Sequence, residues 1–213
     1  MRNGEVLRTT LYGMVTRIAL LLFDGVDLLD TGGPYEVFLT ANRLAQRAGD
    51  VAPFEVLTVA LGGGGVTAYG GLGLRPDAAV ENVADIDVLL VPGAIDIDGA
   101  LSDQRLIDLV ARRAAEGQVV ASVCTGAFVL GAAGLLENRP FTTHFEDVAE
   151  LAKRVESAAP RATVRWVDDG AVVTSGGLSS GIAMSLHLVE RYAGRTLAEA
   201  TARQIDYVWT EQR

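Results

Sequence analysis

The sequence is poor in several features that identify whole classes of protein. Cysteine occurs once in 213 residues, at Cys124, so no disulfide can form within the chain and nothing indicates an oxidising compartment. The most apolar early run, residues 17–23, is far shorter than the roughly 20 residues that a membrane-spanning helix needs. It also lacks the charged flank and cleavage site of a signal peptide. We therefore expect a cytoplasmic protein with no membrane partner.

Basic clusters, repeats and low-complexity tracts are missing as well. The net charge of −9 argues against binding by phosphate neutralisation, so no nucleic-acid partner is expected. Two histidines and one cysteine at these spacings match no metal site. The glycine run 62–65 is followed by neither a Gly-Lys pair nor a helical pattern, so it fits neither a P-loop nor a dinucleotide fingerprint. We expect no metal and no cofactor.

The chain does contain a regular alternation of strand and helix patterns. Nearly continuous apolar runs, typical of strands buried on both faces, occupy residues 15–23, 54–61, 86–93 and 118–123. Helical spacing of apolar residues marks residues 30–45, 103–116, 125–136, 146–157, 179–194 and 196–209. Alternation of this kind predicts an α/β three-layer sandwich, a mostly parallel central sheet with helices on both faces.

Shorter signals refine this outline. Residues 66–76 suggest a short, irregular strand pair, 140–145 a short extended piece, and 163–175 a hairpin with Asp169-Gly170 as its turn. Ser102 is expected to cap the helix over 103–116 and Gly117 to end it. We expect residues 1–14 to be a disordered or artificially added extension and residues 15–213 to form one domain.

The only cysteine stands where a strand pattern gives way to a helix pattern. In parallel sheets the binding crevice lies beyond the carboxyl ends of the strands, and a helix N-terminus there favours a thiolate. A sharp strand-to-helix turn would present Cys124 as a nucleophile elbow does, and the small residues Gly126 and Ala127 permit such a turn. A lone buried cysteine is otherwise a small hydrophobe, and position alone leaves both interpretations open.

A nucleophilic thiol needs an acid or base beside it. The first strand-to-helix connection carries four acids: Asp24, Asp27, Asp30 and Glu36. Asp30 stands out because it follows two leucines and precedes a Gly-Gly-Pro corner, whereas the others read as solvated or helix-start acids. Burial against a leucine would raise the pKa of Asp30 and let it transfer protons.

The histidines are less informative. His187 lies within a helical pattern and reads as a packing or surface residue. His144 follows two threonines at a strand end, so it either faces the crevice or hydrogen-bonds a neighbouring loop. A Cys-His-acid triad would need His144 within reach of Cys124, which the residues alone do not decide.

Three stretches together resemble a known superfamily. Residues 21–38, 122–145 and 174–186 look like the ThiJ/PfpI superfamily, within the class I glutamine amidotransferase-like, flavodoxin-like fold. The resemblance covers residues 15–192. It is strongest to the branch that contains isonitrile (isocyanide) hydratase and the amidotransferase-like halves of certain AraC-type regulators.

The resemblance implies roles for individual residues. Cys124 would be the nucleophile, Asp30 the general acid or base bonded to it, and Thr125 would orient the thiol and offer a backbone N–H. The implied binding set is Gly93, Gly126, His144, Gly176 and Leu178. The resemblance also implies a homodimer acting on a small molecule.

The pattern departs from the hydratase branch in two places. Thr31 and Gly32 follow the acid where the branch has leucine and threonine, and Ala94 replaces the second glycine after Pro92. These departures leave the chemistry intact and the substrate open.

Three functions remain open on this basis. The first is a cofactor-independent, cysteine-dependent hydratase, a lyase that converts a small isocyanide to an N-substituted formamide. The second is a glyoxalase-, amidase- or protease-like enzyme of the same fold that uses Cys124 with His144. The third is a non-catalytic redox or small-molecule sensor in which Cys124 is oxidised to a sulfinic acid.

Overall fold

A seven-stranded sheet forms the centre of the molecule. The computed structural model describes residues 15–212; the predicted extension at residues 1–14 lies outside them. The strand order is β10-β11-β7-β6-β1-β2-β5, parallel except where β10 meets β11. The strands are Thr16–Leu22 (β1), Phe54–Ala60 (β2), Ala78–Ala79 (β5), Val88–Val91 (β6), Val119–Ser122 (β7), Trp166–Asp169 (β10) and Val172–Ser175 (β11). Two small ribbons pair Val66–Thr67 (β3) with Gly73–Leu74 (β4), and Pro140–Phe141 (β8) with Ala159–Pro160 (β9).

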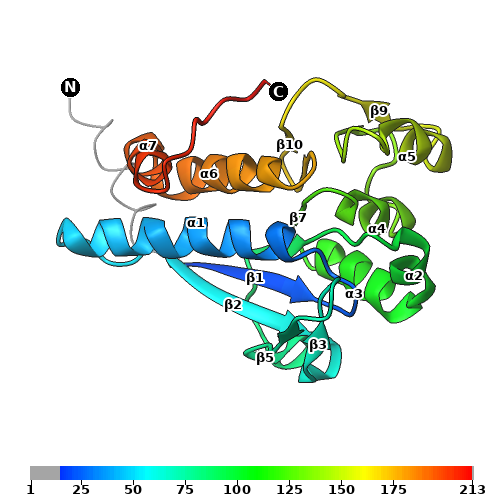
Figure 1. Ribbon diagram of the computed structural model, residues 1–213, viewed down its shortest axis with the longest axis horizontal. Coiled ribbons are helices and arrows are strands. Elements are labelled where there is room, and N and C mark those ends of the chain that lie inside the picture. The colour runs from blue at the N-terminus through cyan, green and yellow to red at the C-terminus, as the bar shows by residue number, and fades with distance from the viewer. Residues whose placement is uncertain (1–14, 213) are drawn as a thin grey trace.

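Helices cover both faces of this sheet, as predicted (Figure 1). They are Leu28–Arg47 (α1), Ile97–Ser102 (α2), Gln104–Ala115 (α3), Gly126–Ala132 (α4), Val148–Arg154 (α5), Ser179–Ala193 (α6) and Arg195–Gln204 (α7). Along β1, Ile18 and Leu20 pack in one core with α1, α6 and α7. Ala19 and Leu21 pack in a second core with α3, α4 and α5. Because side chains alternate along a strand, one short apolar strand supplies both cores.

Several helix boundaries differ from the predicted ones. Helix α1 begins at Leu28, before the Gly-Gly-Pro sequence, because the Asp27 carboxylate caps it by accepting from the Leu29 amide at 3.0 Å. The predicted cap Ser102 is wrong: Ser102 ends α2, and Asp103 caps α3 by accepting from the Arg105 amide at 3.1 Å. Asp103, the residue after Ser102, therefore occupies the N-cap position of α3.

Two predicted helices end early, each before a residue with positive φ. Helix α4 ends at Ala132, and Gly134 follows with φ 76°. Helix α7 ends at Gln204 because Asp206 has φ 54°, so the chain from Ile205 to Trp209 is not helical. Aspartate tolerates this left-handed conformation better than most residues, which lets α7 stop without a glycine.

Four neighbouring strands, β11, β7, β6 and β1, place their carboxyl ends at one edge of the sheet. The residues that follow them include Gly176, Cys124, Gly93 and Asp30. The topology therefore gathers the implied site residues from four separate segments, at the edge where open α/β sheets bind ligands.

Candidate active site

Cys124 sits on a strained corner between β7 and α4. Its φ is +55°, a left-handed conformation that costs a residue with a β-carbon about 1–3 kcal/mol. Two hydrogen bonds hold it: the Cys124 amide donates to the Gly176 carbonyl at 3.2 Å, and the Thr143 hydroxyl donates to the Cys124 carbonyl at 2.7 Å. The residue is buried, with 8% of its surface exposed. This is the geometry of a nucleophile elbow.

Asp30 is fully buried in the first turn of α1. The Gly93 amide donates to its Oδ2 at 3.1 Å. Its Oδ1 makes no hydrogen bond of standard geometry within residues 15–212, although the Cys124 thiol and the Leu178 amide lie close enough to lower the carboxyl pKa. Burial, and then the negative charge of Asp27, outweigh these bonds and raise the pKa of Asp30 to about 7. Asp30 can therefore both hold and release a proton near neutral pH.

The predicted thiolate is wrong for the resting protein. Burial, and then the neighbouring Asp30 carboxylate, raise the pKa of the Cys124 thiol to about 12. The Thr125 and Leu178 amides act in the opposite direction and are outweighed. Helix α4 has only seven residues, so its terminus does not reverse this balance. Asp30 is the adjacent group that could accept the thiol proton.

Two backbone amides face the sulfur, those of Thr125 and Leu178. The Leu178 amide also interacts with Asp30, so it serves both groups. Leu178 has φ +49° and ψ −102°, a second strained residue beside Cys124. Two unfavourable backbone conformations at one site indicate that the surrounding structure holds the amides in place.

The Thr125 hydroxyl does not point at the thiol. It accepts from the Ala94 amide at 2.9 Å and donates to the Ala94 carbonyl at 2.8 Å, so it fixes the loop after β6. A methyl group at Gly93 would lie 2.5 Å from this hydroxyl and 2.7 Å from Asp30 Oδ2. Glycine is required here because three segments meet around it.

The other predicted glycines act through packing and backbone groups. A methyl group at Gly126 would collide with the Val91 and Pro92 carbonyl oxygens, so glycine lets α4 start directly against the end of β6. Gly176 contributes its carbonyl to the Cys124 amide.

His144 is engaged by its own loop. Its Nδ1 lies 3.3 Å from Asp147 Oδ2, and its ring stacks beside Phe145 at a centroid distance of 4.6 Å. The ring edge packs against Gly177, next to Leu178. His187, the other histidine, is partly buried and binds Asp168 at 2.7 Å, which fits the predicted packing or surface role.

Two supporting contacts could not be predicted from the sequence. The Thr143 hydroxyl that holds the Cys124 carbonyl, and the Ala94 backbone that holds Thr125, belong to segments with no distinguishing local pattern. Thr143 follows β8, outside the seven-stranded sheet, and Ala94 follows β6, so each contact joins segments that come together only in the folded chain.

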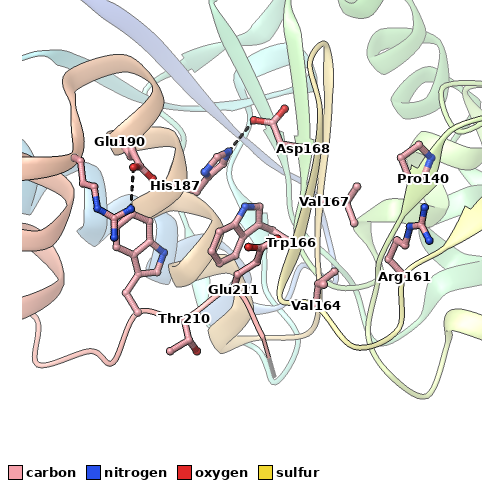
Figure 2. A pocket seen from close by; sticks show the side chains of 12 residues that line it. Pro140, Arg161, Val164, Trp166, Val167, Asp168, His187, Glu190, Thr210 and Glu211 are labelled. Carbon is pink, nitrogen blue, oxygen red and sulfur yellow. Dashed lines mark hydrogen bonds and ion pairs between the residues drawn. The ribbon is translucent and has the colours of Figure 1, made fainter.

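A separate cavity of about 620 Å³ lies at the β10 edge of the sheet. Figure 2 shows Trp166 and His187 together on one side and Arg161 on the other. Its lining comes from β10, α6, Arg195 and the segment from Trp209 to Glu211, and it includes none of the residues described around Cys124.

Several exposed apolar side chains lie close in sequence to the site residues. Leu29, Ile95, Phe145 and Leu178 are all more than a third exposed. Leu178 is itself a site residue, and the other three lie within two positions of Asp30, Gly93 or His144 in the chain.

Comparison with known proteins places this chain in a family. The model of the DJ-1/PfpI family matches residues 16–191, and the chain belongs to that family. The chain is 32% identical to an isonitrile hydratase of Pseudomonas putida over 91% of this chain and 79% of the relative. It is 30% identical to the HTH-type transcriptional regulator GbdR of Pseudomonas aeruginosa over 89% of this chain, which spans half of the regulator.

Solved structures agree. A ThiJ/PfpI family protein from Pseudomonas syringae superposes with a TM-score of 0.80 at 28% identity, covering 97% of this chain and 81% of that one.

Within residues 15–212, no helix is long and apolar enough to span a membrane. The same residues hold no cluster of three His, Cys, Asp or Glu side chains that could hold a metal ion.

Proposed function

We propose that the protein is a cofactor-independent hydratase, a lyase that adds water to a small apolar isocyanide and releases an N-substituted formamide. The observation that carries the proposal is the buried pair of Cys124 and Asp30, whose pKa values are both raised. Similarity to an isonitrile hydratase supports the choice of reaction. The chemistry requires one proton shared between a sulfur and a carboxyl group.

The first half of the reaction forms a thioimidate. The ionised Asp30 takes the thiol proton as the Cys124 sulfur bonds to the terminal isocyanide carbon, and it then delivers that proton to the same carbon. The sulfur–carbon and carbon–hydrogen bonds form, and the sulfur–hydrogen bond breaks. The Thr125 and Leu178 amides stabilise the negative charge on sulfur during the transfer.

The second half releases the product. Asp30, ionised again, accepts a proton from water as the water oxygen adds to the thioimidate carbon. Asp30 passes this proton to the thioimidate nitrogen, which gives a tetrahedral adduct with one hydroxyl group. The carbon–oxygen double bond then forms as the carbon–sulfur bond breaks, and the hydroxyl proton goes to the sulfur. One isocyanide and one water give one formamide, and Cys124 returns to its thiol form.

The surroundings favour an apolar substrate. Leu178, whose amide lies beside the sulfur, has a 40% exposed apolar side chain that offers hydrocarbon contact for the substituent on the isocyanide nitrogen. We expect the enzyme to act in the cytoplasm, where its single thiol stays reduced.

We also propose that the protein is a homodimer. The exposed apolar side chains near the site are the kind of surface that a second copy buries. Light scattering after gel filtration measures the mass; a monomer would contradict this part of the proposal.

The test of the proposed function is turnover of an aromatic isocyanide, followed by appearance of the formamide. We expect the wild type to turn over and Cys124→Ala to lose activity completely, with an unchanged thermal midpoint as the control for folding. Formamide production by Cys124→Ala would overturn the mechanism. Absence of turnover by the wild type would overturn the substrate class.

A further inference from the structure

The loop from Gly176 to Leu178 supplies the groups that complete the thiol site. The Gly176 carbonyl accepts a hydrogen bond from the Cys124 amide at 3.2 Å. The Leu178 amide interacts with both Cys124 and Asp30. Leu178 is 40% exposed and has a left-handed backbone. Burial of Leu178 therefore does not fix this loop. The His144 ring packs against Gly177 in its middle, and hydrogen bonds hold its two ends.

One end is held through Arg165, which precedes β10. The Gly176 amide donates to the Arg165 carbonyl at 2.8 Å. On its other side the Arg165 amide donates to the Glu211 carbonyl at 2.7 Å, and its Nε donates to the Gln212 carbonyl at 3.3 Å. The backbone of Arg165 is thus fixed between the loop and the segment from Ile205 to Gln212, which we call the C-terminal segment.

The other end is held through Tyr207, in the same segment. The Tyr207 hydroxyl donates to the Ser179 carbonyl at 2.9 Å, directly after Leu178, and accepts from Arg165 Nη1 at 3.1 Å. The guanidinium of Arg165 also lies over the Tyr207 ring, 5.9 Å from its centroid. Tyr207 and Arg165 therefore form one connected unit that contacts both ends of the loop.

We propose that Tyr207 and Arg165 are positioning residues, which act through Gly176 and Ser179 to hold the Leu178 amide against the sulfur and the carboxyl group. Neither side chain touches the reacting atoms; they fix the loop that does. As far as it concerns turnover, this inference rests on the proposed function. As far as it concerns the reactivity of the thiol, it stands on the contacts alone.

The test is the rate at which iodoacetamide alkylates Cys124, the only cysteine, measured by intact mass across a range of pH. Tyr207→Phe removes the hydroxyl and keeps the ring. Because it frees the Leu178 amide to move away from the sulfur, we expect alkylation to slow by about 3- to 10-fold at each pH, the effect of one lost hydrogen bond. A merely structural role would loosen the site and leave alkylation unchanged or faster.

Trp209→Phe is the matched control. It removes the hydrogen bond from Trp209 Nε1 to the Ala183 carbonyl, 3.0 Å long, which ties the same segment to α6 one turn beyond the loop. We expect its alkylation rate to stay within about twofold of the wild type.

Arg165→Met keeps the backbone bonds but removes the donor to Tyr207. It should slow alkylation as Tyr207→Phe does, and it replaces Tyr207→Phe if that variant does not fold.

The outcomes separate this inference from the proposed function. Slower alkylation in Tyr207→Phe with an unchanged rate in Trp209→Phe supports it. An unchanged or faster rate in Tyr207→Phe, or an equal slowing in both variants, overturns it. Failure of the wild type to hydrate isocyanides would overturn the proposed function and leave the alkylation comparison valid.

Discussion

The Gly93 amide donates to Asp30 Oδ2 at 3.1 Å, which joins the end of β6 to the first turn of α1 across 63 residues of sequence. This bond fixes one carboxyl oxygen. The other, Oδ1, is buried without a bond of standard geometry among residues 15–212. One oxygen of Asp30 is therefore structural, and the other is available for proton transfer to the thiol or the substrate.

The pH profile of the reaction should follow Asp30. The active form holds one proton between Asp30 and Cys124, so it is populated above the Asp30 pKa of about 7 and below the Cys124 pKa of about 12. We expect kcat/KM to rise with pH through about 7 and then level off. We expect the kcat/KM of Asp30→Asn to be lower than that of the wild type by about 100-fold or more. A profile that falls through pH 7 would contradict this assignment.

The same residue should limit stability. The folded pKa of Asp30 is raised from 3.8 to about 7, so the folded state holds a proton that the unfolded state releases. The protein therefore loses stability as pH rises between these values. Asp30→Asn, which carries no charge, should be more stable than the wild type at pH 8 by about 2–4 kcal/mol and equally stable near pH 3. Urea unfolding at both pH values measures this; equal stabilities at pH 8 would refute it.

His144 should be dispensable for turnover. Because its Nδ1 pairs with Asp147 at 3.3 Å, we expect His144→Ala to keep kcat/KM within about threefold of the wild type, well short of the roughly 100-fold or more that loss of a general base costs. Asp147→Asn, which removes the charged partner of His144, serves as the control and should also keep kcat/KM within about threefold of the wild type. A loss of 100-fold in His144→Ala alone would favour the glyoxalase-, amidase- or protease-like alternative.

Two glycines offer a matched test of the packing behind the thiol. Gly126→Ala should destabilise the protein by about 1–3 kcal/mol or prevent folding, because its methyl group meets two fixed carbonyl oxygens. Gly32→Ala, in α1 with open space around it, should stabilise by up to about 1 kcal/mol. Thermal unfolding of the two variants gives the comparison, and similar midpoints would argue against the close approach of α4 to β6.

Mild oxidation should separate an enzyme from a redox sensor. The raised pKa of Cys124 leaves little thiolate at neutral pH, and the thiolate is the form that peroxide oxidises. We expect no mass increase at low peroxide and neutral pH. A gain of two oxygen atoms at Cys124 under those conditions, without isocyanide turnover, would support the sensor.

The sequence was most informative where one local pattern decides the structure. The apolar runs of β1, β2, β6 and β7 predicted the parallel sheet, because strands buried on both faces are continuously apolar and do not alternate with polar residues. The position of Cys124 at a strand-to-helix corner followed from the same runs. The position of Asp30 after two leucines singled it out, and the family resemblance then implied its role as general acid or base; its complete burial is a property of the fold.

What failed depends on competition between neighbours or on segments distant in sequence. Asp103 displaced Ser102 as a cap, and Asp206 ended α7 without a glycine. A helix N-terminus that favours a thiolate is visible in sequence, whereas the extent to which burial and the Asp30 charge raise the thiol pKa is set by the folded chain. The contacts of Arg165 with Tyr207, 42 residues apart, likewise exist only in the folded chain.

The C-terminal segment has a practical consequence for anything attached behind it. A reporter, tag or second domain joined after Gln212 would be connected to the nucleophile by a short chain of contacts: Gln212 to Arg165, Arg165 to Gly176, and Gly176 to Cys124. These bonds end on the Cys124 backbone amide, so a fusion at this junction should be checked for altered reactivity of the thiol.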